Sequence, residues 1–272
     1  MNRLPIGIFD SGLGGLTVAA AIFQRLPHDS TIYFGDTARV PYGPKSPATV
    51  RRYSREILAW LLDQGVKAVV VACNTSTAHA LEELQQVSPV RVIGVIEPGA
   101  RAAVRAAPRA PIGVIGTAGT VASGAYVRGI HALDATHEVI QRACPLLVPI
   151  VEEGWFDHPA AELIAREYLA PLQSAGIGAL VMGCTHYPLL KPLLGRILGP
   201  GVALIDSAEE TAAAVAEVLT AEGLDAPSDA VPSHRYAVSD DAPRFLEVGA
   251  RFLGERLLEA DVVEPGGVST RS

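Results

Sequence analysis

Two cysteines stand at matching places in the sequence, each directly after a short apolar run. Cys73 lies in the segment VVVACNTST and Cys184 in the segment ALVMGCTHYP, and small polar residues follow both at once. A single cysteine at the end of a strand is most often a small buried hydrophobic residue. The polar residues that follow each cysteine instead suit a site where a helix N-terminus and hydroxyl or amide groups hold a carboxylate.

The two thiols together permit one specific reaction. A thiol at a helix N-terminus or beside a cation has a pKa below its usual value of about 8.5 and is available as a thiolate. Two acid/base groups on opposite faces of one carbon allow one to remove a proton while the other returns it, which inverts the configuration. Cys73 and Cys184 therefore predict racemase chemistry, with one thiol starting as thiolate and the other protonated.

Other polar residues follow apolar runs at comparable places. Asp10 and Ser11 follow one run and Thr117 follows another. Ligands of parallel α/β sheets bind beyond the carboxyl ends of the strands, so these side chains are candidates for the same site. His186 can stabilise a thiolate at the cysteine two residues before it or carry a proton. Asp10 has two interpretations, a cap for the next helix or a carboxylate facing a substrate ammonium group.

The elements that must position these residues alternate between strand and helix patterns, which is typical of mostly parallel sheets flanked by helices. A helix is expected from Ser46-Pro47, a cap followed by proline, to about Gln64. Another is expected from Ser207, which opens a capping-box pattern, to Gly223. The expected strands are Ile6–Phe9, Thr31–Phe34, Ala68–Ala72, Arg91–Ile96, Ile112–Ile115, Leu180–Met182 and Val202–Ile205.

The chain is expected to form two similar α/β domains with the active site between them. The strand-and-turn segment GIFDSG has a counterpart GVIGTA at nearly the offset that separates the two cysteines. We predict a first domain of residues 1–97 plus 207–255 and a second domain of residues 98–206. Residues 256–272 are expected to form a loose tail.

Composition and charge exclude several classes of function. The chain has 272 residues, 49% hydrophobic and 19% charged, as expected for globular domains. Its net charge of −7 and the lack of a long Lys/Arg run argue against a nucleic-acid surface. No apolar run approaches the roughly 18 residues of a membrane span and no signal peptide is recognisable, so a cytoplasmic location is expected. Three cysteines without CxxC spacing argue against disulfides and zinc, and Cys144 is expected to be a buried structural thiol.

Two glycine-containing segments need separate interpretation. The turn around Tyr42-Gly43 is bounded by prolines, and it is either a rigid loop or a set of backbone N–H groups presented to a carboxylate. The segment DSGLGG lacks the GxGxxG spacing of a dinucleotide-binding loop. Its glycines are therefore expected to let the backbone approach a substrate.

Five motifs in order carry a resemblance to a known family. They are DSGLGGLTV (Asp10–Val18), RVPYGPKS (Arg39–Ser46), ACNTSTA (Ala72–Ala78), VPIVEEG (Val148–Gly154) and GCTHYPLL (Gly183–Leu190). Together they resemble the glutamate racemases, cofactor-independent enzymes of the aspartate/glutamate racemase superfamily. The resemblance covers roughly residues 5 to 255.

The resemblance implies a function and a set of site residues. It implies interconversion of L- and D-glutamate, which supplies D-glutamate for peptidoglycan, with Cys73 acting on D-glutamate and Cys184 on L-glutamate. Asp10 and His186 look like the groups that tune the two thiols, with Glu152 as a possible assistant near His186. The residues implied to line the substrate are Asp10, Ser11, Tyr42, Gly43, Asn74, Thr75, Thr185 and His186.

The resemblance also bears on cofactors and partners. No cofactor is implied, because a Schiff-base mechanism needs a lysine in the site and none of Lys45, Lys67 and Lys191 replaces a cysteine. No metal, nucleic acid or membrane partner is expected, and a homodimer is implied by the family. Two alternatives stay open. One is an aspartate racemase, whose substrate is one methylene shorter, and the other is a binding or regulatory protein such as a gyrase inhibitor.

Overall fold

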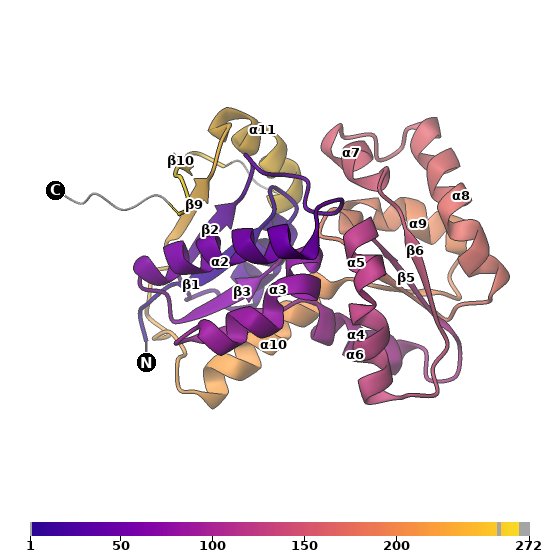
Figure 1. Ribbon diagram of the computed structural model, residues 1–272, viewed down its shortest axis with the longest axis horizontal. Coiled ribbons are helices and arrows are strands. Elements are labelled where there is room, and N and C mark those ends of the chain that lie inside the picture. The colour runs from indigo at the N-terminus through magenta and orange to yellow at the C-terminus, as the bar shows by residue number, and fades with distance from the viewer. Residues whose placement is uncertain (1, 255–256, 267–272) are drawn as a thin grey trace.

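The computed structural model describes residues 2–254 and 257–266, which form two α/β domains lying side by side (Figure 1). Each domain contains one sheet whose paired strands all run parallel, with helices packed around it. The predicted architecture of two α/β domains with mostly parallel sheets flanked by helices is therefore confirmed. Within the described ranges, no helix is both long and apolar enough to cross a membrane.

The first domain is built on a six-stranded sheet in the order β10-β9-β2-β1-β3-β4. Its strands are β1 (Ile6–Asp10), β2 (Thr31–Gly35), β3 (Ala68–Val71), β4 (Arg91–Gly94), β9 (His234–Val238) and β10 (Asp261–Val262). Its helices are α1 (Leu16–Arg25), α2 (Pro47–Asp63), α3 (Asn74–Val87), α10 (Ser207–Ala221) and α11 (Ala242–Leu253). The three strands β1, β2 and β3 are buried along their whole length, as expected for apolar runs in a parallel sheet covered on both faces.

The second domain is built on a four-stranded sheet in the order β6-β5-β7-β8. Its strands are β5 (Ile112–Gly116), β6 (Val139–Ala143), β7 (Ala179–Gly183) and β8 (Ala203–Ile205). Its helices are α4 (Ile96–Ala106), α5 (Ala118–Ser123), α6 (Ala125–Leu133), α7 (Leu147–Glu152), α8 (Pro159–Ser174), the 3-10 helix η1 (Tyr187–Leu190) and α9 (Lys191–Leu198). The central pair β5 and β7 is fully buried.

All seven strands expected from apolar runs are present, but three further strands were not expected. The unexpected strands β6, β9 and β10 lie at or next to sheet edges and carry polar or charged residues, so they lack a continuous apolar run. β4 ends at Gly94 rather than at the expected Ile96, because Val95 already has helical dihedral angles and Ile96 opens α4.

The first residues of α2 and α10 show whether the capping residues expected from the sequence are correct. Ser46 caps α2, since its hydroxyl accepts a hydrogen bond from the Thr49 amide at 3.3 Å, and α2 then runs to Asp63 as expected. The expected capping box at Ser207 is wrong. Asp206 is the cap of α10, and its carboxylate accepts from the Ala208 amide at 2.9 Å.

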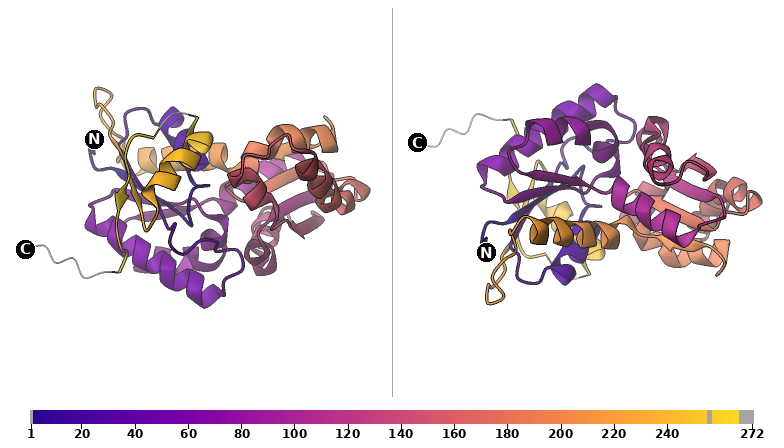
Figure 2. Two further views of the ribbon diagram at one scale, coloured as in Figure 1. Left: turned by 90° about the horizontal axis from the view of Figure 1, so that it is seen from above. Right: turned by 90° about the horizontal axis from the view of Figure 1, so that it is seen from below.

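The chain crosses between the domains twice. It enters the second domain through α4 and returns through α10, which packs against α1 and lies along the first domain (Figure 2). The described part of the expected tail is not loose, because Leu257 is 5% exposed and β10 pairs with β9. The remainder, residue 256 and residues 267–272, lies outside the described residues.

A buried ion pair closes the first domain at the amino ends of its strands. The side chains of Lys67 and Asp29 are only 1% and 5% exposed, and the Lys67 ammonium also donates to the Leu224 carbonyl at 2.7 Å. Removing one partner leaves the other as a buried charge without compensation. This pair therefore couples the start of β3 to the loop before β2.

We predict that Lys67→Met lowers the free energy of unfolding by about 3 kcal/mol, because the Asp29 carboxylate stays buried without its cation. Urea unfolding followed by circular dichroism measures the change. The double variant Lys67→Met with Asp29→Asn should recover part of the loss, since no charge is then buried. A double variant no more stable than the single one contradicts the electrostatic explanation.

Candidate active site

The two cysteines lie at the carboxyl ends of strands, at the point in each sheet where the strand order reverses. β1 has β2 on one side and β3 on the other, and β5 has β6 on one side and β7 on the other. Such positions are where parallel α/β sheets bind ligands. Cys73 follows β3 and Cys184 follows β7, so each domain contributes one thiol from equivalent places.

Cys73 is a buried thiol at the N-terminus of α3. Its sulfur lies 3.5 Å from the Ser76 amide and 3.6 Å from the Ser11 hydroxyl, and the residue is 5% exposed. Burial and, after it, the charge of Asp10 raise the pKa of Cys73 to about 11, against the lowering effect of Ser76 and Ser11. The expected acidification of this thiol by the helix is therefore wrong for this structure, because desolvation outweighs the helix N-terminus.

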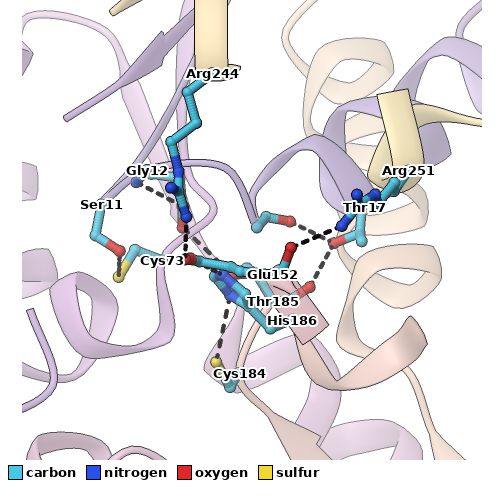
Figure 3. A network of polar contacts seen from close by, with 12 residues as sticks. Ser11, Gly12, Thr17, Cys73, Glu152, Cys184, Thr185, His186, Arg244 and Arg251 are labelled. Atoms are coloured by element: carbon cyan, nitrogen blue, oxygen red, sulfur yellow. Dashed lines mark hydrogen bonds and ion pairs between the residues drawn. The ribbon is translucent and has the colours of Figure 1, made fainter. Parts of the chain in front are cut away.

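Cys184 has a different environment, built around a histidine. Its sulfur lies 3.9 Å from His186 Nδ1, and His186 Nε2 lies 3.0 Å from a carboxylate oxygen of Glu152 on α7 (Figure 3). Burial lowers the pKa of His186, but the hydrogen bonds and charges of Cys184 and Glu152 outweigh it and raise the pKa to about 10. His186 is thus an imidazolium at neutral pH, and its charge lies beside the Cys184 sulfur.

Asp10 connects the two thiol environments across the domain boundary. It is fully buried, one oxygen accepts from the Gly12 amide at 2.9 Å, and the other lies 3.5 Å from the Thr185 hydroxyl. Burial raises the pKa of Asp10, while the charge of His186 and the backbone N–H groups of its own loop lower it. Asp10 is not a helix cap, because α1 begins after Gly15 with no side-chain cap.

Asn74 and Thr75 begin α3 and reach toward the second domain. The Asn74 side-chain oxygen accepts from the Tyr126 hydroxyl at 2.7 Å, whereas its amide nitrogen Nδ2 is buried and has no hydrogen-bond partner among the described residues. The Thr75 hydroxyl lies 2.9 Å from the hydroxyl of Thr117, the cap of α5. A buried donor without a partner is rare in proteins and marks a place for a ligand acceptor.

The Tyr42-Gly43 turn also bridges the domains. The Tyr42 hydroxyl donates to the buried Asp36 carboxylate, and the Gly43 carbonyl accepts from the Gly119 amide at 2.9 Å. A Cβ on Gly43 would lie 2.8 Å from Thr117 Cβ. The rigid-loop interpretation of this turn is therefore supported by its contacts.

The DSGLGG loop packs directly against the residues that follow Cys184. A Cβ added at Gly14 would lie 2.2 Å from the Thr185 hydroxyl and 2.5 Å from His186 Nδ1, and the Thr17 hydroxyl lies 3.2 Å from the Thr185 carbonyl. Glycine at position 14 thus allows close approach between the domains. The sequence had suggested close approach to a substrate instead.

The structure brings the site residues named from the sequence to one region, where the carboxyl ends of the two sheets meet. They are Asp10, Ser11, Tyr42, Gly43, Asn74, Thr75, Glu152, Cys184, Thr185, His186 and Cys73. Sequence reasoning missed the side chains that hold them, namely Asp36, Thr120, Tyr126 and Arg244. None of these four lies in a chemistry-bearing motif, so no sequence signal pointed to them.

A third thiol and the arrangement of possible metal ligands also bear on the chemistry of the protein. Cys144 is buried as expected, and burial raises the pKa of this thiol to about 12. Across residues 2–254 and 257–266, no group of three or more His, Cys, Asp or Glu side chains is arranged to hold a metal ion.

Comparisons with known proteins agree on one family. The family model described as Asp/Glu/Hydantoin racemase matches residues 16–215. A glutamate racemase of Geobacter metallireducens is 55% identical over 252 residues, which are 93% of this chain and 93% of that protein. A solved glutamate racemase isoform of Bacillus anthracis has a TM-score of 0.93 at 40% identity, over 97% of this chain and 98% of that one. A Francisella tularensis glutamate racemase in complex with D-glutamate has a TM-score of 0.92 at 36% identity, over 98% and 100%.

We predict that Asp10→Asn speeds the alkylation of Cys73 about 3- to 10-fold at pH 8.5, because the carboxylate charge raises the pKa of this thiol. Asparagine keeps an oxygen for the Gly12 amide, so the loop is retained. Iodoacetamide labelling with peptide mass spectrometry measures each cysteine separately. Cys144 serves as the internal control, and an unchanged rate at Cys73 contradicts the assigned role of Asp10.

Proposed function

Because the chain belongs to the Asp/Glu/Hydantoin racemase family and is thus a racemase, an isomerase, we propose that its substrate is glutamate and that it interconverts the L and D enantiomers. The high identity to a glutamate racemase over most of both chains supports this substrate. The observation that carries the proposal is the placement of one buried cysteine at the carboxyl end of each sheet, with Asp10 and His186 between them.

The proposed mechanism uses the two thiols as acid and base. In the L-to-D direction the Cys184 thiolate removes the α-proton of L-glutamate, and the electron pair left at Cα is delocalised into the substrate carboxylate. The Cys73 thiol then donates its proton to the opposite face of Cα. The products are D-glutamate, a Cys184 thiol and a Cys73 thiolate, and the reverse reaction starts from that state.

The surroundings of the two cysteines support this assignment of roles. The pKa of about 11 makes Cys73 a thiol at neutral pH, ready to donate a proton. The imidazolium of His186 lies beside the Cys184 sulfur, where the mechanism places the thiolate. A protonated Cys73 suits the L enantiomer, which needs it as the proton donor.

Polar groups around the two thiols can bind the charged groups of the substrate. Asn74 Nδ2 is a buried donor available to a substrate carboxylate, and the hydroxyls of Ser11, Thr75 and Thr185 are further donors. The buried Asp10 carboxylate suits the α-ammonium group. A carboxylate held by neutral donors has less need of a lysine or metal cation to bind in the site.

The wider role is part of the proposal. D-Glutamate made by this reaction would supply peptidoglycan synthesis in the cytoplasm, where three unpaired cysteines are stable in reduced form. A homodimer is expected from the family. Aspartate differs from glutamate by one methylene, which a pocket distinguishes by about 1–3 kcal/mol, so slow aspartate turnover is compatible with the proposal.

We predict that Cys73→Ala and Cys184→Ala each lower glutamate racemisation by at least about 10³-fold, because each removes one of two obligatory proton-transfer groups. Circular dichroism follows the loss of the ellipticity of L-glutamate and of D-glutamate in separate reactions with the cofactor-free, reduced protein. Cys144→Ala is the matched control and should keep most of the activity, since this buried thiol donates to the Arg142 carbonyl rather than to a residue of the proposed site.

The same assay in D2O tests the proton transfer itself. Product formed by the unaltered protein should carry deuterium at Cα, while aspartate should change much more slowly. Racemisation without deuterium uptake, or substantial turnover in either cysteine variant, would overturn the two-base mechanism. A gyrase supercoiling assay with the double variant separates a regulatory role from catalysis.

A further inference from the structure

The C-terminal helix of the first domain reaches across to the acid/base pair of the second. Arg244 and Arg251 on α11 both contact Glu152, which lies at the end of α7 (Figure 3). The Arg244 guanidinium lies 3.9 Å from one carboxylate oxygen of Glu152, and the other oxygen lies 3.0 Å from His186 Nε2. The Glu152 carboxylate thus lies between two cations, Arg244 of the first domain and His186 of the second.

Arg251 holds the backbone of the same residue. Its guanidinium donates to the Glu152 carbonyl at 2.7 Å, at the carboxyl end of α7 where helix carbonyls lack partners within the helix. Gly154, with φ of +74°, lies directly beneath this guanidinium, and a Cβ there would be 3.0 Å from the Arg251 nitrogen. The end of α7 is therefore shaped around Arg251.

A third contact from the same helix fixes the histidine ring. The ring of Phe252 meets the ring of His186 edge-on, with centroids 5.2 Å apart and an interplanar angle of 82°. Phe252 follows Arg251 in the chain, and both lie in the last turn of α11. One helix end therefore contacts both members of the Glu152–His186 pair.

The surrounding space explains why Glu152 needs to be held. A cavity of about 80 Å³ lies between the domains and is lined by Glu152, Arg244 and Phe245 together with the loop at Gly12-Leu13. This volume is several times that of one water probe, so it leaves room for the Glu152 side chain to leave His186. Contacts that fix its position are then needed to keep the imidazolium paired.

From these contacts we infer that Arg244 and Arg251 are positioning residues for racemisation, which act by holding Glu152 against His186 and hence the charge beside Cys184. The inference rests on the proposed racemisation of glutamate. It assigns to α11 a part in catalysis, although neither arginine contacts the cysteines. Because α11 belongs to the first domain and Glu152 to the second, these contacts form only when the two domains are closed against each other.

A double-mutant cycle with Glu152→Gln tests the inference. Arg244→Gln and Arg251→Gln should each lower kcat about 5- to 20-fold, since small displacements of a catalytic group are costly, and leave KM within about 3-fold because neither arginine is among the groups proposed to hold the substrate. In the Glu152→Gln background the same substitutions should change kcat by less than about 2-fold, because the group that they position is already lost.

Two controls separate positioning from general destabilisation. Arg251→Lys keeps a donor and a charge for the Glu152 carbonyl and should retain most of the activity. Arg166→Gln removes an equally exposed arginine from a surface ion pair with Glu162 on α8, and should leave kcat unchanged. Melting temperatures measured on every variant identify any that fail to fold.

A second readout needs no substrate. The rate at which iodoacetamide alkylates Cys184 should shift in Arg244→Gln and Arg251→Gln toward the rate of Glu152→Gln, and the combined variants should shift no further. Additive losses of kcat, or Cys184 rates that stay at the unaltered value, would overturn the inference even in an active racemase. If the unaltered protein does not racemise glutamate, the proposed function fails, and the alkylation rates still decide whether α11 positions Glu152.

Discussion

Burial of charged groups where the two domains meet is the constraint on which the site depends. Asp10 is fully buried and His186 is 5% exposed, so desolvation opposes the ionised form of both side chains. Each is stabilised by groups from the opposite or neighbouring element, with Thr185 at Asp10 and Glu152 at His186. Separating the domains would break the contact of Asp10 with Thr185 and the contacts of α11 with Glu152. The acid/base groups and the closed arrangement of the domains are therefore one structural unit.

The two halves of the site share geometry but differ in electrostatics. Both cysteines follow the strand next to a central strand, which reflects the similar plan of the two domains. Cys73 is surrounded by hydroxyl and amide groups and faces the negative Asp10, whereas Cys184 faces the positive His186. A similar fold in both domains therefore places one thiol beside a negative group and the other beside a positive group. The residue two positions after each cysteine, Thr75 or His186, makes much of the difference.

The sequence predicted the residues that do chemistry better than the residues that hold them. A cysteine at a strand end with polar residues directly after it is a pattern that can be recognised locally in the sequence. The apolar run before each cysteine, which becomes β3 or β7, can be recognised in the same way. The capping of α10 by Asp206 was missed by one residue, because adjacent Asp and Ser both suit a cap. Tyr126, which donates to Asn74 from another domain, is separated from it by 52 positions, and no local pattern encodes that contact. Edge strands such as β6 were missed because their residues are partly exposed and polar.

The asymmetry of the two thiols cannot change kcat/KM for one enantiomer without changing it equally for the other. Enantiomers have equal free energy in water, so the equilibrium mixture is racemic and kcat/KM must be the same in both directions. The environments of Cys73 and Cys184 can change only how kcat and KM divide that common value. In the proposed mechanism, the free enzyme with Cys73 protonated, the state that its pKa favours, reacts with the L enantiomer, while the D enantiomer needs the form with Cys73 ionised. The less stable form is reached by moving a proton between the cysteines. Asp10, whose charge raises the pKa of Cys73, is one group that sets the balance between the two forms.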